Sequence, residues 1–295
     1  MTRNTRIEDS GRVITTSCHK SVTGDTDIRS SRRRWYSDAC VIVSDGSPSI
    51  PARIGVSLDP ETPRDLDLLQ ELQRAHLRTV PFETLDIARN EPIVLDLSSL
   101  YAKIIDRERG GFCYELNSLF GWLLRQLGYD VRIVEGRVRD DTEAFGPPFD
   151  HMALLVDLKR RYLVDVGFGD FCRRPLPMAG DSLSDVSGTY RITPADDPGH
   201  YFTQEQTDSE WTPSYRFTTE ERVLADFIEM CEYQQTAEES AFIGRTVCTI
   251  ATGSGRVTLS DDTLIVTENG GKRSETVSSQ QKRARVLDDC FGISL

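Results

Sequence analysis

Residues 109–128 read RGGFCYELNSLFGWLLRQLG and contain the clearest structural signal of the chain. From residue 116 onward, apolar side chains recur at the helical spacing i, i+3, i+4, i+7, i+8 and i+11. Gly128 follows and supplies a left-handed stop. The pattern predicts an amphipathic helix directly after two glycines and a cysteine. Its apolar positions are Leu116, Leu119, Phe120, Leu123, Leu124 and Leu127.

Two more helices are expected upstream of this segment. Thr62 followed by Pro63 is a helix start signal, because the first helical N–H has no partner in any case. Apolar side chains and a histidine follow near helical spacing, at Leu66, Leu69, Leu72, His76 and Val80. Asp96 can cap another helix, whose apolar face carries Leu97, Leu100, Tyr101, Ile104 and Ile105. The first part of the protein is therefore expected to be a small helical bundle.

Downstream of Gly128 the pattern changes to short apolar runs typical of strands. The expected strands cover residues 131–138, 151–158, 161–166, 190–193, 247–250 and 256–259. Further helices are expected near residues 219–231 and 279–290. Helices, then antiparallel strands, then a mixed C-terminal part indicate an α+β fold.

Composition narrows the classes of function. The chain has 295 residues, 38% of them hydrophobic, and a net charge of −12, which repels nucleic-acid phosphates. No apolar run is long enough to span a membrane, and the start does not resemble a signal peptide. The seven cysteines are scattered without a Cys-x-x-Cys pair, so neither a metal site nor a disulfide scaffold is expected. These features predict a cytoplasmic protein without a nucleic-acid or membrane partner.

Residues 1–48 differ from the rest of the chain. They are rich in Ser, Thr, Arg and Asp and show no sustained apolar periodicity. This composition predicts a disordered extension. The run at residues 30–34 (SSRRR) leaves a basic interaction patch as an alternative.

Cys113 stands directly before the clearest predicted helix, after Gly110 and Gly111. A thiol at a helix N-terminus faces the positive end of the helix dipole and unpaired N–H groups, which lower its pKa. Glycines also let the backbone approach a ligand closely. By position alone, Cys113 fits a buried structural cysteine as well as a nucleophile.

A cysteine nucleophile needs a base partner, which a histidine can supply. The chain contains His19, His76, His151 and His200. His19 lies in the N-terminal extension, His76 within a helical pattern and His200 in a loop. His151 begins an apolar run directly after a loop with glycine and proline, and catalytic side chains are common at such strand ends. His151 is therefore the candidate base.

Asp165 lies in the apolar run that follows the strand of His151. A buried aspartate needs a partner. A hairpin turn centred near Leu158 would place residues 151 and 165 opposite each other, so that the carboxylate orients the imidazole. An ion pair with an arginine is the alternative.

Four blocks of the sequence together resemble the arylamine N-acetyltransferase family. They are VPFETL at residues 80–85, RGGFCYELN at 109–117, HMALLV at 151–156 and DVGFG at 165–169. Their order and separations match the family pattern. The resemblance runs from about residue 52 to the C-terminus, is strongest through residue 169, and does not include residues 1–48.

The resemblance implies a helical bundle, a middle antiparallel β-barrel-like domain and a C-terminal α/β lid around a cysteine-protease-like core. The corresponding boundaries are 49–135, 136–217 and 218–295. It also implies that an acetyl group moves from acetyl-CoA to the cysteine and then to an arylamine or hydrazine. Acetyl-CoA is then a cosubstrate, and no cofactor is bound permanently.

The resemblance assigns roles to the matching residues. Cys113, His151 and Asp165 correspond to the catalytic triad. Phe82 and Phe168 correspond to the wall of the acceptor pocket, and Gly167 and Gly169 to a loop near the pyrophosphate of coenzyme A. Glu83 and Arg109 correspond to supporting polar residues near the site.

Other functions remain open at this level. The same triad order would serve a cysteine hydrolase or a transglutaminase-like enzyme, and an amide synthase of a biosynthetic pathway would share the family pattern. A non-catalytic binding protein on a retired enzyme fold is a further alternative. No Gly-x-Gly-x-x-Gly follows a strand and no Walker lysine loop occurs, so a dinucleotide enzyme has no support. The oligomeric state is not predicted.

Overall fold

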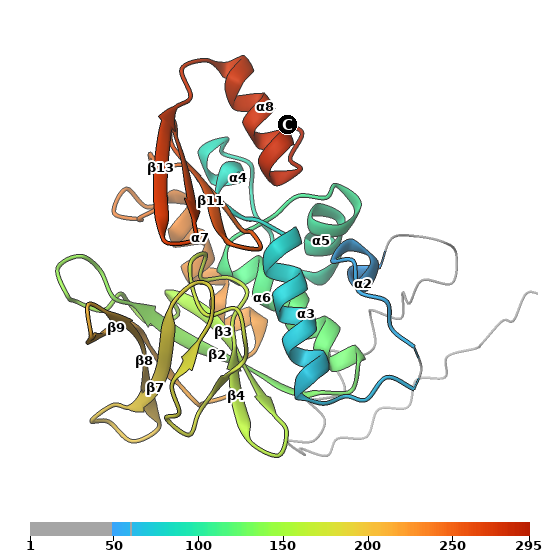
Figure 1. The fold of residues 1–295 in the computed structure, drawn as a ribbon, viewed down its shortest axis with the longest axis vertical. Helices are drawn as coiled ribbons and strands as arrows, with labels where there is room; N and C mark the ends of the chain where they lie inside the picture. Colours follow the sequence, from blue (N-terminus) through green and yellow to red (C-terminus); the bar gives the residue numbers. More distant parts are fainter. Residues whose placement is uncertain (1–48, 60) are drawn as a thin grey trace, which may run out of the picture. The chain divides into compact units, whose positions relative to one another are not determined.

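The computed structural model describes residues 49–59 and 61–295, and the extension predicted over residues 1–48 lies outside them. The first part is helical, as Figure 1 shows. Its elements are α2 (Ile50–Arg53), α3 (Leu66–Thr79), β1 (Phe82–Glu83), α4 (Leu85–Ala88), α5 (Leu97–Tyr101), the π-helix η1 (Ala102–Asp106) and α6 (Cys113–Gln126). No helix of the described residues is long and apolar enough to cross a membrane.

Helix α3 begins later than predicted. Asp65 caps it, because its Oδ1 accepts hydrogen bonds from the N–H groups of Asp67 and Leu68. The hydroxyl of Thr62 instead accepts from the N–H of Asp59 and closes a turn outside the helix. The predicted start at Thr62 was wrong because two capping residues lie close together and the sequence does not rank them.

Helix α6 is the centre of the fold. It packs on β2 and β3 on one side and on α5 on another. Its first two turns are buried all round, including the polar residues Glu115, Asn117 and Ser118. The predicted helix is therefore present, but it has no polar face in the half that carries Cys113.

The middle of the chain forms one antiparallel sheet. Its order is β5-β4-β3-β2-β9-β8-β7-β6, and β5 also contacts β7, so the sheet curls toward a barrel. The strands are β2 (Asp130–Val138), β3 (His151–Asp157), β4 (Arg161–Val164), β5 (Leu176–Pro177), β6 (Leu183–Ser184), β7 (Thr189–Pro194), β8 (His200–Thr207) and β9 (Glu210–Thr218). The sequence did not predict β8 and β9, because their many polar side chains hide the alternation of buried and exposed positions.

The hairpin of β3 and β4 has a different register from the predicted one. Leu154 pairs with Val164 and Asp157 pairs with Arg161. The turn is thus centred one residue later, and Asp165 continues past the ladder toward Ala153 rather than His151. The expectation that residues 151 and 165 lie opposite each other was wrong by two residues.

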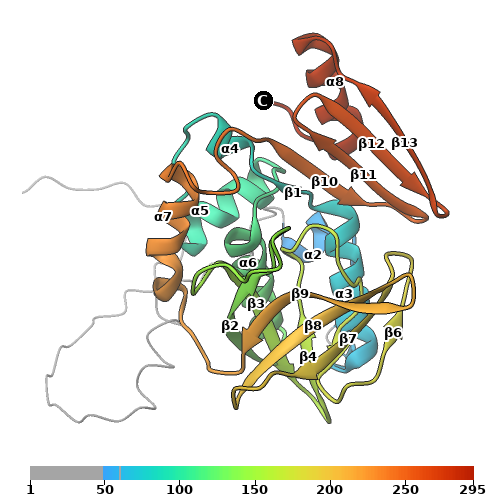
Figure 2. The same ribbon diagram turned by 90° about the vertical axis from the view of Figure 1, so that its left-hand side faces the viewer.

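The C-terminal part is a second sheet covered by a helix. Its order is β1-β10-β11-β12-β13, so β1 from the helical part pairs with β10. Figure 2 shows α8 along one face of this sheet, where Leu287 and Phe291 join its core. The elements are the 3-10 helix η2 (Leu224–Phe227), α7 (Ile228–Thr236), β10 (Val247–Ala251), β11 (Gly255–Ser260), β12 (Thr263–Glu268), β13 (Gly271–Thr276) and α8 (Gln280–Phe291).

The α+β class is therefore confirmed, with a helical part, a barrel-like sheet and a smaller sheet with its helix. The helix expected at residues 219–231 was misplaced, since a short 3-10 turn precedes α7, which extends to Thr236. Strand β2 crosses the domain boundary expected after residue 135, and the domain limits stay a prediction.

Candidate active site

Cys113 is the first residue of α6 and is 4% exposed. Among the groups that act on its thiol are the backbone N–H of Met152, the residue next to His151, and the carboxylate of Asp165. Burial raises the pKa of the Cys113 thiol well above its usual range, and the Met152 N–H acts in the lowering direction. This net direction is opposite to the one expected from the helix start. A thiolate here therefore depends on a partner that takes up the proton and carries positive charge.

His151 and Asp165 form a buried pair. Nε2 of His151 lies 2.7 Å from Oδ2 of Asp165. The other carboxylate oxygen accepts from Nδ2 of Asn117 at 3.0 Å and from the N–H of Gly167 at 2.8 Å. Burial alone raises the pKa of Asp165, but His151, Asn117 and Gly167 outweigh it and hold that pKa below its usual range. The carboxylate is thus an anion fixed in one orientation behind the imidazole.

Asn117 joins three segments of the site. It lies one turn after Cys113 on α6, and its Nδ2 donates to the carbonyl of Met152 at 2.7 Å as well as to Asp165. Its Oδ1 accepts from the N–H of Val166 at 3.0 Å. Sequence analysis did not single out Asn117. The available signal was an amide at an inward position of the helix that carries Cys113.

Two glycines allow close packing around Cys113 and His151. A Cβ at Gly167 would lie 2.7 Å from Cα of Cys113 and 2.7 Å from Nδ2 of Asn117. A Cβ at Gly136 on β2 would lie 3.4 Å from the side chain of His151. Only a residue without a side chain lets the loop after Asp165 lie directly on the first turn of α6.

Aromatic side chains surround the site. The ring of Phe168 lies 5.4 Å from the imidazole of His151, nearly perpendicular to it. Phe242 lies 6.5 Å from Phe82 and 5.9 Å from Phe112, measured between ring centroids. Gly169 has a positive φ of 93° and lies against Phe82, which brings the loop that carries Phe168 close to Phe82. Phe242 was not predicted, because it follows α7 in a segment without a recognisable motif.

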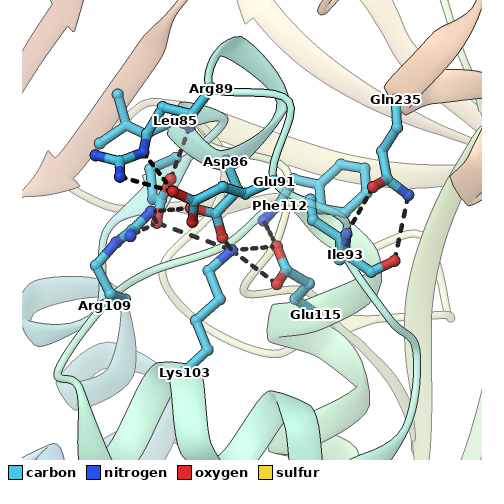
Figure 3. Close-up of polar contacts among 11 residues, drawn as sticks. Leu85, Asp86, Arg89, Glu91, Ile93, Lys103, Arg109, Phe112, Glu115 and Gln235 are labelled. Carbon is cyan, nitrogen blue, oxygen red and sulfur yellow. Dashed lines mark hydrogen bonds and ion pairs between the residues drawn. The ribbon is translucent and has the colours of Figure 1, made fainter. Parts of the chain in front are cut away.

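Glu83 and Arg109 are paired in a buried ionic cluster, drawn in Figure 3. Nη2 of Arg109 lies 2.7 Å from Oε1 of Glu83 and 2.7 Å from Oδ1 of Asp86. Oε2 of Glu83 accepts from the N–H of Leu85 at 2.8 Å. The cluster ties the segment before Cys113 to β1 and α4, and Asp86 is a member that sequence analysis missed.

The fold and the site together define a cysteine enzyme with a cysteine-protease-like core, in which a histidine and a carboxylate stand behind a cysteine at a helix start. The N-acetyltransferase family model matches residues 65–295. The chain belongs to the arylamine N-acetyltransferase family.

Several members of this family are similar to the chain over most of their length. The arylamine N-acetyltransferase of Mycolicibacterium smegmatis is 34% identical, over 81% of this chain and 90% of that protein. The pineal gland isozyme NAT-10 of Gallus gallus is 30% identical, over 79% and 89%.

Solved structures agree with the sequence relatives. An arylamine N-acetyltransferase of Bacillus cereus superimposes with a TM-score of 0.78 at 29% identity, covering 83% of this chain and 97% of that one. It is described with a Cys-His-Glu catalytic triad. The structure from M. smegmatis gives a TM-score of 0.76 at 33% identity, covering 83% and 91%. In the present chain the carboxylate that pairs with His151 belongs to an aspartate, Asp165.

Proposed function

We propose that this protein transfers an acetyl group from acetyl-CoA, through a thioester on Cys113, to the nitrogen of an arylamine or hydrazine. The observation that carries the proposal is the buried His151–Asp165 pair at 2.7 Å, which Asn117, on the same helix as Cys113, contacts by donating to Asp165 at 3.0 Å. A buried thiol is useful for acyl transfer when a base next to it removes the proton.

In the first half-reaction, the sulfur of Cys113 attacks the thioester carbonyl, and its proton passes to His151. The carbon–sulfur bond to coenzyme A then breaks, and the departing thiolate takes the proton from His151. Asp165 stabilises the imidazolium that exists between these steps. Backbone N–H groups near the start of α6 would stabilise the developing oxyanion.

In the second half-reaction, the amine nitrogen attacks the carbonyl carbon of the acetyl-cysteine. His151 accepts a proton from the nitrogen and returns it to the sulfur of Cys113 as the carbon–sulfur bond breaks. An arylamine is mostly uncharged near pH 7, so its lone pair is available for attack.

The remaining predicted residues have roles that agree with their surroundings. Phe82 and Phe168 would form the apolar wall for the aromatic acceptor. Gly167 and Gly169 belong to the loop that would lie near the pyrophosphate of coenzyme A. Gly169 would let a backbone N–H reach a phosphate oxygen, whereas the N–H of Gly167 already donates to Asp165. Glu83 and Arg109 would hold the segments around the nucleophile, as their ion pair supports.

A cytoplasmic location is part of the proposal. The five cysteines among the described residues, Cys113, Cys172, Cys231, Cys248 and Cys290, are unpaired. Free thiols persist in a reducing compartment.

Intact-protein mass spectrometry after brief exposure to acetyl-CoA tests the function. We expect one added acetyl group, located on Cys113 by peptide mapping, which disappears when an arylamine is added and appears as acetylated amine. The variant Cys113→Ala is the control and should stay unmodified. Consumption of acetyl-CoA at the same rate with and without amine would instead identify a hydrolase.

A further inference from the structure

The ionic cluster of Figure 3 contains two residues that the proposed reaction leaves without a role. Lys103 and Glu115 are only 4% and 1% exposed. Together with Glu83, Asp86 and Arg109 they bring three carboxylates and two cations into one buried group. Burying so many charges is costly unless each makes specific contacts.

Glu115 reaches back to the residue that precedes the nucleophile. It is the third residue of α6, and its Oε2 accepts from the N–H of Phe112 at 3.1 Å. Phe112 has no side-chain acceptor for the N–H groups of the first turn, so the bond from its own N–H to Glu115 is the one half of a capping box that these residues can form. A Cβ at Gly111 would lie 2.7 Å from Oε2, which shows how closely the incoming backbone lies on the carboxylate.

Lys103 holds the carboxylate of Glu115 from the opposite side. Its Nζ lies 2.8 Å from Oε1 and 3.0 Å from Oε2 of Glu115, and 2.8 Å from Oδ2 of Asp86. Lys103 lies on the π-helix η1, where it and the next two residues, Ile104 and Ile105, are all buried. Such wide turns occur often at functional sites.

The charge of Lys103 favours the ionised form of Glu115, in which both oxygens accept. Burial raises the pKa of Glu115 to about 7, whereas Lys103 acts in the lowering direction. The other charged or titratable groups near Glu115 are Glu83 of β1, Asp86 of α4, Arg109 before α6 and the thiol of Cys231 on α7.

The geometry points to Glu115 and Lys103 as positioning residues for the nucleophile: the Glu115 carboxylate, held by Lys103, fixes the Phe112 N–H and thereby sets where Cys113 enters α6. This inference rests on the proposed function, because a positioned nucleophile matters only if Cys113 takes up the acetyl group. The reactivity of the thiol toward an alkylating reagent can nevertheless be measured without acetyl transfer. Small displacements of a nucleophile slow a reaction strongly, because reacting atoms must be aligned.

The test compares Glu115→Gln, Glu115→Met and Lys103→Met in the full chain. The readouts are the rate of Cys113 alkylation by iodoacetamide and the rate of Cys113 acetylation, each across pH 5.5 to 8.5 (about 1.5 units on either side of neutral pH). Glutamine keeps an acceptor for the Phe112 N–H and leaves two carboxylates with two cations. We expect Glu115→Gln to keep both rates within about threefold across this range, because the amide oxygen still accepts from the Phe112 N–H.

Methionine has a similar length but no oxygen. Glu115→Met therefore leaves the Phe112 N–H unpaired and should lower both rates by about 10- to 100-fold without changing the KM for the amine. Lys103→Met removes the cation that holds the Glu115 carboxylate in place, and it should also lower both rates. Glu91→Gln is the matched control, since it removes an exposed ion pair with Arg89 in the same region and should change neither rate.

A folded Glu115→Met protein that alkylates and acetylates at the wild-type rate would overturn the inference. Should that variant fail to fold, wild-type rates of alkylation and acetylation in a folded Lys103→Met protein would overturn it instead. The failure of the proposed function has a different signature: wild-type Cys113 is alkylated but never acetylated, while the alkylation rates of the variants still decide the positioning role.

Discussion

The hydroxyl of Tyr215 donates to Oδ2 of Asp165 across 3.0 Å, to the same oxygen that lies 2.7 Å from Nε2 of His151. Tyr215 comes from β9, which the sequence did not predict, and lies 50 residues after Asp165 in the chain. Burial raises the pKa of Tyr215 far above its usual range, so its hydroxyl stays a donor. The carboxylate beside His151 is therefore held by a strand three positions away from β4 in the sheet.

Replacing Tyr215 with Phe should slow both half-reactions. The loss of one charge-assisted hydrogen bond is worth about 1 to 3 kcal/mol, which corresponds to about 5- to 100-fold in kcat if the bond supports the imidazolium. The KM for the amine should change little. Tyr190→Phe is the matched control, because that buried tyrosine donates to Glu205 at 3.2 Å instead. Equal kcat values for the two variants would contradict a role for Tyr215.

Replacing Asp165 with Asn should lower kcat by about 10²- to 10⁴-fold, because an amide cannot stabilise a charged His151. Asp165→Glu keeps the charge and should retain more activity than Asp165→Asn. Stopped-flow measurement of Cys113 acetylation separates this effect from amine binding. Asparagine and glutamate variants with the same rate would show that geometry, and not charge, is the contribution of Asp165.

Replacing Gly167 with Ala should displace the loop from the first turn of α6. The added methyl would lie 2.7 Å from Cα of Cys113, and such overpacking destabilises a protein by about 1 to 3 kcal/mol. We expect both a lower urea midpoint and a loss of acetylation. Gly253→Ala is the control, since its Cβ would lie at an ordinary 3.5 Å from Nη2 of Arg78. An unchanged acetylation rate in Gly167→Ala would show that the loop is free to move.

Stability should fall in mild acid because of His76. Burial, followed by the charge of Arg53, lowers the pKa of His76 from 6.5 to about 3. The unfolded chain then binds more protons between these values, so the free energy of unfolding decreases as pH falls through that range. This one group accounts for about 2 kcal/mol between pH 6.5 and 5. Urea unfolding of wild type and His76→Phe at both pH values tests it: equal decreases in the two proteins would exclude His76 as the cause.

The pairing of His151 with Asp165 shows what the local sequence pattern could predict about the site. The sequence indicated a hairpin and an aspartate that needed a partner, and this was enough to find the pair. The register was wrong by two residues, yet the side chains still meet, because residues two positions apart point to the same side of a strand. The predicted proximity of His151 and Asp165 was therefore correct although the predicted centre of the turn was not.

The failures occurred where a local signal had a competitor or was absent. Thr62 and Asp65 both resemble helix caps, and only the packing of α3 selects between them. Strands β8 and β9 carry many polar side chains, so their sequence has no strong period of two. Phe242 and Tyr215 lie outside every recognised block, and nothing near them in sequence indicates that they face the site.

The sequence by itself determined the α+β order of elements, the helix that begins at Cys113, and the family, because each depends on short-range periodicity or on contiguous motifs. Only the tertiary structure decided what surrounds Asp165 and Glu115. Asn117, Tyr215 and Lys103 reach them from other segments of the chain. A buried carboxylate without hydrogen bonds or an opposite charge would destabilise the folded protein, so such partners are needed. This requirement exists only in the folded chain, because the carboxylate is solvated by water before folding.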